Sequence, residues 1–299
     1  MPEQSISIIR VPFGLGAGRP GSEHGPDSIM KFGLAKKLAG LGYDVEADRS
    51  IRLPEGVRSP AGTKMKHVQE VLAVCARLGE AVSEAVADGR IPLVLGGDHS
   101  IAIGSLAGLT RHYGNMGVIW VDAHSDLNTE STSPSGNMHG ISLAAGLGLT
   151  HLKLKQIAEG AASLKAEHCV IIGARDLDRD EKALIRSCGL TCFTMHEIDR
   201  LGIEQVVREA LRIAGQGTDG VHLSFDIDSV DPIEAPGTGT PVRGGLSYRE
   251  AHLLLELLSE SGAVTSADFM EVNPLLDRNN QTSKLAVELI GSLFGSRIL

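Results

Sequence analysis

The alternation of short apolar segments with longer helical patterns is the feature that most constrains the fold of this chain. About eight segments have the length and apolar character of strands, and several are apolar on both faces. They are residues 5–12, 43–47, 91–95, 117–121, 169–172, 191–194, 221–225 and 264–269. Strands without a polar face are typical of a parallel sheet covered by helices on both sides. We therefore predict an α/β fold, a three-layer α/β/α sandwich on a central parallel sheet of about eight strands.

Helical periodicity fills most of the sequence between these segments. Asp27 or Ser28 is the expected N-cap of the first helix. No linker or low-complexity segment interrupts the pattern, so we expect one domain over residues 1–299. The predicted helices span residues 26–38, 64–87, 141–146, 179–187, 203–214, 248–258 and 282–293, with another from the G-G-D-H-S segment to about residue 112.

A glycine-rich loop near the N-terminus matches a dinucleotide-binding pattern only in its letters. Gly16, Gly18 and Gly21 have the spacing G-x-G-x-x-G, but Pro20 lies inside the match. Residues 22–26 continue as loop where the dinucleotide motif requires a helix to begin. We interpret the loop instead as the rim of an active site.

Composition excludes several classes of function. The chain of 299 residues is 42% hydrophobic and 22% charged, which is typical of a globular protein. Its net charge of −9, without a run of Lys or Arg, argues against nucleic acid as a partner and suits a cationic substrate. No apolar stretch approaches the roughly 18 residues that span a membrane. The four cysteines lack C-x-x-C spacing, and no basic segment precedes the first apolar run, so we expect reduced thiols and a cytoplasmic protein.

One stretch, G-V-I-W-V-D-A-H-S-D at residues 117–126, combines a buried strand with three potential metal ligands. Asp122, His124 and Asp126 lie at i, i+2 and i+4, so an extended backbone directs them to one side. A buried carboxylate without a counter-charge would cost several kcal/mol. A cation bound among the three side chains is the simplest explanation.

Acidic and histidine residues also follow other predicted strands. Asp98 and His99 follow one strand, Asp226 and Asp228 another, and Glu271 a third. In open parallel sheets the functional site lies at the carboxyl ends of the strands, so these side chains should meet there. The alternative is that the carboxylates only cap helices or orient loops or ligands, which suits Asp98 and Asp231 best.

The combined set contains enough ligands for two metal ions that share carboxylates. Oxygen ligands with a few imidazoles favour Mn²⁺ over a metal that prefers thiolates. Two divalent ions, four Asp and one hydroxide leave a net negative charge, which suits a cationic electrophile. Because paired ions can activate a bridging water, we predict metal-assisted hydrolysis.

Four motifs together resemble the ureohydrolase superfamily, which includes arginases and agmatinases. They are G-G-D-H-S at 96–100, D-A-H-S-D at 122–126, S-F-D-I-D-S-V-D-P at 224–232 and M-E-V-N-P at 270–274. The segment S-P-S-G-N-M-H-G at 133–140 resembles the arginases in particular. The resemblance covers nearly the whole chain and implies the same eight-stranded α/β/α fold.

The resemblance also implies a ligand set and a reaction. One Mn²⁺ would be held by His99, Asp122, Asp126 and Asp226, and a second by His124, Asp122, Asp226 and Asp228, with Asp122 and Asp226 bridging. A metal-bridging hydroxide would attack the guanidinium carbon of L-arginine and give L-ornithine and urea. Bacterial arginases are commonly hexamers, so a homo-oligomer, hexamer or trimer, is expected.

Roles for the remaining site residues follow from the same resemblance. His139 matches the histidine that moves protons or assists the leaving amine, which suits a side chain that titrates near neutral pH. Glu271 matches the carboxylate that binds the guanidinium, and two parallel hydrogen bonds are possible there. The substrate-binding set would comprise Thr240 beside Glu271, Asn128, Ser135 and Asn137 for the α-carboxylate, and Asp178 and Glu181 near the α-amino group.

The sequence departs from the arginase pattern in two places. In the N-terminal loop Gly14 stands where arginases usually have Asp, and Pro20 and Glu23 also differ. Ser229 stands where arginases usually have Gly, and with A-P-G-T-G-T-P it resembles agmatinases.

Three functions therefore remain open, of which arginase is favoured. The second is another ureohydrolase, such as an agmatinase, a guanidinobutyrase or an enzyme for a formimino substrate. A substrate without an α-carboxylate would have no use for Asn128, Ser135 and Asn137. The third is a non-catalytic metal-binding member of the fold, which the complete ligand set argues against.

Overall fold

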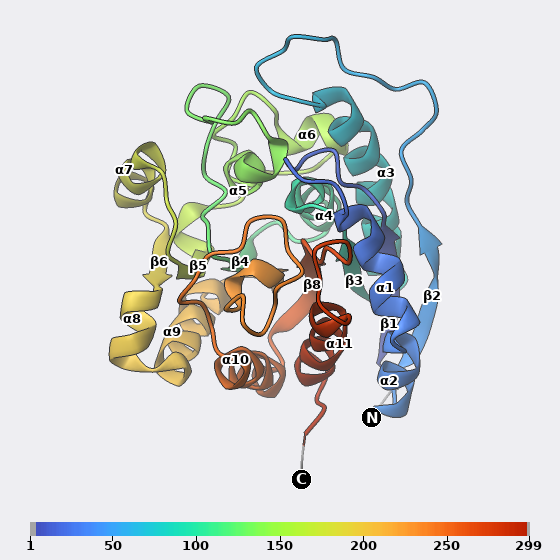
Figure 1. Cartoon of the computed structure of the whole chain (residues 1–299), viewed down its shortest axis with the longest axis vertical. Coiled ribbons are helices and arrows are strands. Elements are labelled where there is room, and N and C mark those ends of the chain that lie inside the picture. Colours follow the sequence, from blue (N-terminus) through green and yellow to red (C-terminus); the bar gives the residue numbers. More distant parts are fainter. Residues whose placement is uncertain (1–3, 298–299) are drawn as a thin grey trace.

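Eight strands form a single sheet in which every neighbouring pair is parallel, in the order β2-β1-β3-β8-β7-β4-β5-β6. The computed structural model describes residues 4–297 (Figure 1). The predicted parallel sheet of about eight strands is confirmed. The strands are β1 (Ser5–Val11), β2 (Asp44–Ser50), β3 (Ile91–Gly96), β4 (Met116–Val121), β5 (Cys169–Ala174), β6 (Thr191–Thr194), β7 (Gly220–Asp226) and β8 (Val264–Met270).

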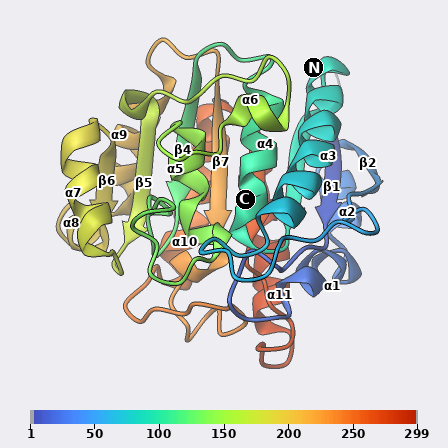
Figure 2. The same cartoon turned by 90° about the horizontal axis from the view of Figure 1, so that it is seen from above.

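Helices cover both faces of the sheet and make the outer layers of the sandwich (Figures 1 and 2). One layer contains α1 (Gly25–Lys31), α2 (Leu34–Gly40), α8 (Met195–Leu201), α9 (Ile203–Gly215), α10 (Tyr248–Ser261) and α11 (Gln281–Leu293). The other contains α3 (Val68–Ala87), α4 (Ala102–Leu109), α5 (Ser142–Gly146), α6 (Leu154–Ile157) and α7 (Arg179–Cys188). Short 3₁₀ helices are η1 (Ser22–His24), η2 (His99–Ile101), η3 (Met138–Ile141), η4 (Ala166–His168) and η5 (Ile227–Ser229).

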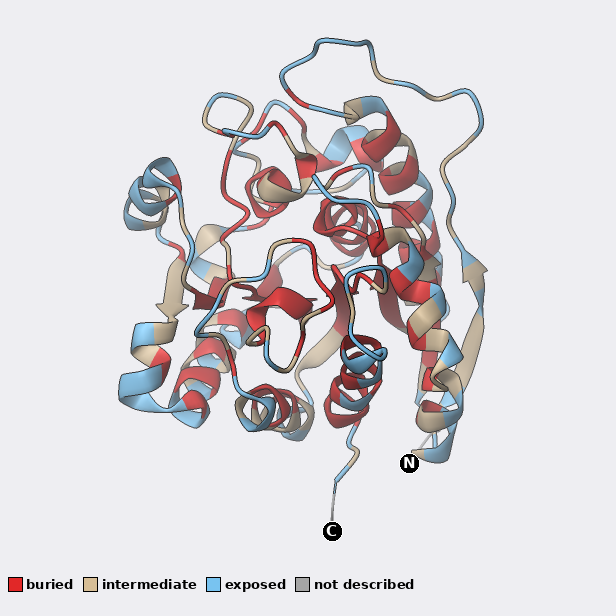
Figure 3. Cartoon of the chain, in the orientation of Figure 1, coloured by how far each residue is buried: buried red, intermediate tan, exposed pale blue. Residues whose placement is uncertain are grey.

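Alternating side chains of each central strand enter the two hydrophobic cores on opposite faces. In β4, Ile119 and Val121 join one core, while Val118 and Trp120 join the other. All residues of β4 are buried, whereas the edge strands β2 and β6 are mostly half-buried and drawn tan in Figure 3. Full burial of such a side chain contributes roughly 1.5–3 kcal/mol. Both faces of the sheet are therefore held in place by apolar packing.

Two predicted helices differ from the structure, and backbone conformation explains both. The helix predicted over residues 26–38 is divided into α1 and α2, because Gly33 adopts a left-handed conformation with φ 89°. Neither Asp27 nor Ser28 caps it; the N-cap position is His24. The helix predicted from residue 64 begins only at Val68, because His67 is left-handed, with φ 54°.

The remaining differences concern short elements. Sequence periodicity missed α6 and α8, which are four and seven residues long. The helix predicted to end near residue 112 ends at Leu109. None of the helices within residues 4–297 combines the length and the hydropathy of a membrane-spanning helix.

Candidate active site

The register of the sheet brings the predicted ligands to one edge. Val121 of β4 pairs with Phe225 of β7, so the residues that follow them, Asp122 and Asp226, are neighbours. Strand β8 lies between β3 and β7, which places Glu271 between the segments that carry His99 and Asp226. Parallel strands end at the same edge, so residues far apart in the sequence meet there.

The first group of ligands surrounds His99. Its Nδ1 lies 3.1 Å from Asp226 Oδ2, 3.2 Å from Asp122 Oδ2 and 3.3 Å from Asp126 Oδ2. All four side chains are buried. A ring nitrogen can donate only one proton, and the buried Asp126 Oδ2 has no hydrogen-bond partner among the described residues. Three carboxylate oxygens around one nitrogen fit a cation better than they fit a proton.

The second group surrounds His124 and shares Asp122 with the first. His124 Nδ1 lies 3.2 Å from Asp228 Oδ2 and 3.4 Å from Asp122 Oδ1. Asp122 thus presents one oxygen to each group, as a bridging ligand would. Asp226 offers Oδ2 to His99, while its Oδ1 accepts a hydrogen bond from the Asp228 backbone N–H at 2.8 Å. The bridging role of Asp226 stays a prediction.

The electrostatics of these groups fit a binuclear metal centre. Burial raises the pKa of Asp126, and the neighbouring charge of Asp122 raises it further. Burial also raises the pKa of Asp226, together with the charges of Asp228 and Asp122. Both pKa values are raised because it costs free energy to hold several charged carboxylates in a site that excludes water. Divalent cations would offset that free energy. The donors are carboxylate oxygens and imidazole nitrogens without a thiolate, a set that suits Mn²⁺.

Neighbouring side chains fix the orientation of the ligands. Ser224 Oγ lies 2.9 Å from His99 Nε2, so the other ring nitrogen faces the carboxylates. Trp120 stacks on the His99 ring, with centroids 4.2 Å apart, and donates from Nε1 to Asp122 Oδ2 at 3.0 Å. Partners of this kind strengthen and orient metal ligands.

Backbone strain occurs at two of the predicted site residues. Asp126 has φ 52° and Glu271 has φ 62°, in the left-handed region that side chains other than glycine rarely adopt. Strain of this kind persists where the surrounding structure imposes it, and it is concentrated at functional sites.

His139 and Glu271 form a hydrogen-bonded pair at the cavity wall. His139 Nδ1 lies 2.9 Å from Glu271 Oε1, which also accepts the His99 backbone N–H at 3.0 Å. Burial lowers the pKa of His139, but the hydrogen bond and charge of Glu271, with smaller effects of Asp126 and Asp98, raise it to about 9. Glu271 Oε2 makes no hydrogen bond within the described residues.

The glycine-rich N-terminal loop contacts the site through Gly16. Its N–H donates to Asp98 Oδ2 at 2.8 Å, and its carbonyl accepts the His139 backbone N–H at 3.2 Å. A Cβ at Gly16 would lie 2.4 Å from Asp98 Oδ1, so only glycine fits. Asp98 therefore anchors the loop and does not join the ligand groups.

Two of the departures from the arginase pattern are spatially coupled in this loop. A Cβ at Gly14 would lie 2.4 Å from Glu23 Oε2, and that oxygen accepts the Gly21 N–H at 2.7 Å. The Glu23 carboxylate thus occupies the space beside Gly14. At the departure outside this loop, Ser229 Oγ donates to the Asp226 carbonyl at 2.7 Å.

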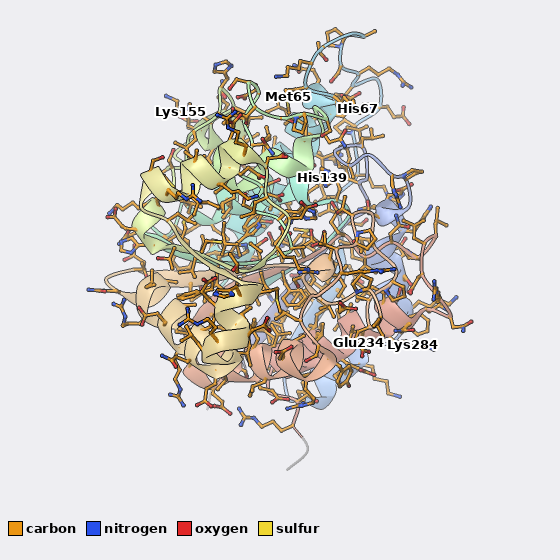
Figure 4. The ribbon with its side chains drawn as sticks, turned by 60° about the vertical axis from the view of Figure 1, so that its left-hand side comes forward. Met65, His67, His139, Lys155, Glu234 and Lys284 are labelled. Atoms are coloured by element: carbon orange, nitrogen blue, oxygen red, sulfur yellow. The ribbon has the colours of Figure 1, made fainter. Side chains whose placement is uncertain are left out.

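The two groups of potential metal ligands adjoin two cavities that share part of their lining. The smaller, of about 140 Å³, is lined by residues that include Asn128, Asp178 and Glu181. The larger, of about 460 Å³, includes Arg19 and Asn137. His124, His139, Asp176 and Thr240 line both. Figure 4 labels His139 among the side chains around this region.

Several predicted substrate residues already have partners within the chain. Asn128 Nδ2 donates to Asp178 Oδ2 at 2.8 Å. Glu181 accepts from Ser125 Oγ at 2.7 Å and from the Asp178 N–H at 2.8 Å, so both of its oxygens are engaged.

Thr240 and Ser135 occupy different positions relative to the cavities. Thr240 Oγ1 donates to Asp228 Oδ2 at 2.9 Å. Ser135 Oγ accepts the Asn137 N–H at 3.1 Å, and Ser135 lines neither cavity.

Arg175 and Asp176 were missed by the sequence analysis. Arg175 donates to the carbonyls of Asp228 at 2.7 Å, Val242 at 2.8 Å, Ser229 at 3.0 Å and Gly173 at 3.2 Å. It thereby connects β5, the end of β7 and the loop that carries Thr240. Both missed residues directly follow β5, so the carboxyl-end rule could have identified them.

Comparison with known proteins places this geometry in a family. A model described as the Arginase family matches residues 4–295. The chain is 49% identical to the arginase of Bacillus caldovelox, covering 98% of this chain and 99% of that protein. It is 48% identical to the arginase of Bacillus subtilis, covering 99% of this chain and 100% of that protein. The crystal structure of arginase from Bacillus cereus superposes with a TM-score of 0.93 at 50% identity, covering 99% of this chain and 100% of that chain.

Proposed function

Because this chain belongs to the arginase family and is therefore a ureohydrolase, we propose that it hydrolyses L-arginine to L-ornithine and urea. The observation that carries the proposal is the pair of ligand groups that share Asp122 within an acidic cavity. A guanidinium cation complements this charge, and neighbouring carboxylates can orient it.

The proposed cofactor is two Mn²⁺ ions per chain. His99, Asp122, Asp126 and Asp226 would hold one ion, and His124, Asp122, Asp226 and Asp228 the other. When bound, such a pair of ions would supply an activated water as the nucleophile for the guanidinium carbon.

Glu271 and His139 have complementary roles in this proposal. Glu271 Oε1 is fixed by the His99 N–H and by His139, which leaves Oε2 to accept a hydrogen bond from the guanidinium. His139 Nδ1 is engaged with Glu271, so Nε2 is the nitrogen that gives a proton to the leaving amine. The raised pKa of His139 keeps that proton available near neutral pH.

The far end of arginine would be held by the polar residues of the cavity rim. Asp178 would accept a hydrogen bond from the α-amino group of arginine. Asn128 donates to the Asp178 carboxylate and so holds that side chain in place. Glu181 supports the same segment through the Asp178 N–H. Asn137, which lines the larger cavity, and Ser135 beside it would serve the α-carboxylate.

A substrate panel tests the function directly. The Mn²⁺-loaded protein is incubated with arginine, agmatine, guanidinobutyrate and formiminoglutamate, and urea or formamide is measured. We expect arginine to have the highest kcat/KM. If agmatine or guanidinobutyrate gives urea and arginine does not, the proposed substrate is wrong. If none of the four compounds gives a product, the proposed hydrolysis is wrong. Metal analysis of the loaded protein should give two Mn²⁺ per chain.

We further propose one domain over residues 1–299, a homo-oligomer that is a hexamer or a trimer, and a cytoplasmic location. Light scattering after size-exclusion chromatography gives the oligomeric state. A single cooperative unfolding transition would support one domain.

A further inference from the structure

Two cationic side chains, Arg19 and Lys66, lie at the mouth of a cavity whose inner wall is acidic. We propose that Arg19 and Lys66 form a cationic rim that selects guanidino substrates with a carboxylate beside the amino group, and so favours arginine over agmatine. This specificity rests on the proposed function and adds two residues that the sequence motifs do not include.

Lys66 is fixed to the cavity wall by its side chain and its backbone. Nζ donates to Asn137 Oδ1 at 3.1 Å, and the backbone N–H donates to the Gly136 carbonyl at 2.8 Å. A Cβ at Gly136 would lie 2.0 Å from the Lys64 carbonyl, so the two loops approach closely only because residue 136 is glycine. Figure 4 labels Met65 and His67, which flank Lys66 in the sequence, above His139.

Arg19 reaches the same wall from the N-terminal loop. It lines the larger cavity together with Gly18, Asn137 and Thr240. A Cβ at Gly18 would lie 2.8 Å from Asn137 Nδ2, so the loop packs directly against the asparagine that Lys66 contacts. Segments around residues 19, 66 and 137 therefore converge on one side of the mouth.

The charges of Arg19 and Lys66 are not neutralised within the part of the chain that the structure describes. Both side chains are exposed, and neither has a described carboxylate at ion-pairing distance. Arg10 and Arg90, by contrast, each form an ion pair with an aspartate at 2.9 Å. Two free cations thus remain available to an anionic group in the cavity.

Acidic side chains line the same site: Asp178 and Glu181 line the smaller cavity, and Asp176 lines both. Arg19 lines the larger cavity, whereas Lys66 lines a separate pocket and reaches the larger cavity only through its hydrogen bond to Asn137. An amino acid with its guanidinium at the metal-ligand groups would place its ammonium toward Asp176 and Asp178. Its carboxylate would then lie toward Arg19 and Lys66. Agmatine has no carboxylate to offer, so it gains nothing from the rim and is repelled by it.

A matched pair of ligands isolates the effect of the carboxylate. L-ornithine and putrescine differ only in that group, and neither is hydrolysed, so calorimetry can measure Kd for both on the Mn²⁺-loaded protein. An exposed ion pair changes affinity by up to about fivefold. Lys66→Met and Arg19→Met should each weaken ornithine binding by about two- to fivefold, and the double variant by about tenfold. Putrescine binding should stay unchanged or become tighter.

Lys64→Met is the matched control. Lys64 is exposed two residues away, but its Nζ donates to the Ser131 carbonyl at 2.8 Å and makes no hydrogen bond to Asn137. This variant removes the same charge and should leave both Kd values unchanged. Lys66→Arg keeps the charge and should retain the ornithine preference of the wild type.

The outcomes separate this proposal from the proposed function. Equal weakening of ornithine and putrescine, or an unchanged ratio in the double variant, would overturn the cationic rim even if arginine is hydrolysed. Absence of urea release from arginine would overturn the function, while the ligand pair would still decide whether the rim recognises carboxylates. In the active protein, the double variant should raise KM for arginine at constant kcat.

Discussion

The inner wall of the site and its rim are built from different kinds of structure. The wall consists of His99, Asp122, Asp126, Asp226 and Asp228, which are buried and follow neighbouring strands of the sheet. The rim consists of exposed loop residues such as Arg19 and Lys66. The wall is fixed by strand register, so a change there disturbs the whole ligand set. The rim tolerates change where a neighbour compensates. Chemistry is therefore expected to depend on the wall, and choice of substrate on the rim.

Loss of a wall carboxylate should have the largest effect. Asp126→Ala removes a predicted ligand and should lower urea release by at least about a hundredfold, since loss of a supporting residue alone costs 10–100-fold. Metal analysis should find fewer than two tightly bound ions per chain. The exposed Asp199→Ala serves as the control of equal charge. Two tightly bound ions in the Asp126→Ala variant would contradict the assignment.

Loss of a residue behind the wall should have the next largest effect. Ser224→Ala removes the partner of His99 Nε2 and should weaken metal binding by about 10–100-fold. Saturating Mn²⁺ should restore much of the turnover, because the ligands themselves remain. Competition with a chelator measures the affinity. Unchanged metal affinity would show that Trp120 stacking alone orients the ring.

The free energies of unfolding of an Arg175 variant and a Lys66 variant compare how much the two regions contribute to stability. Arg175→Met leaves the carbonyls of Asp228, Ser229 and Val242 without their donor and should lower the free energy of unfolding by about 2–4 kcal/mol. Lys66→Met at the rim should change it by no more than about 0.5 kcal/mol. Denaturant titration measures both, and equal losses would remove the distinction between the regions.

A smaller effect than that of Arg175→Met is expected for a change in the N-terminal loop. Gly14→Asp restores the usual arginase residue but places its Cβ against the Glu23 carboxylate, and should destabilise the protein by about 1 kcal/mol. Glu23→Asp shortens that side chain, so the double variant should recover most of the loss. Thermal unfolding of the four proteins in this cycle gives the coupling energy. If the two substitutions have additive effects on stability, residues 14 and 23 are not coupled.

Much of the sheet and its polar edge could be predicted because both depend on local patterns. Apolar runs marked the strands. The extended backbone expected through Asp122, His124 and Asp126 is not found, because β4 ends at Val121 and Asp126 is left-handed, with φ 52°. The parallel topology then required the other strand ends to meet them. The placement of Asp122, with one oxygen toward His99 and the other toward His124, could not have been obtained from spacing alone.

The sequence could not predict features that depend on backbone conformation or on carbonyl partners. His67 is left-handed without being glycine, so helical periodicity misplaced the start of α3. The position of Arg175 directly after β5 could have singled it out, but its partners could not be predicted, because they are main-chain oxygens, which carry no residue-specific pattern. The engagement of both Glu181 oxygens, likewise, is visible only once the loop around Ser125 is folded.

The stacking of Trp120 on His99 has a spectroscopic consequence. The chain has one tryptophan, so its intrinsic fluorescence reports on a single location, adjacent to the predicted ligands. Its indole N–H also donates a hydrogen bond to Asp122, the carboxylate shared by both groups of predicted ligands. Binding of a paramagnetic ion such as Mn²⁺ should quench this emission, and a zinc titration should shift it without the same quenching. The protein thus carries its own optical probe of metal occupancy, which needs neither a label nor a substrate.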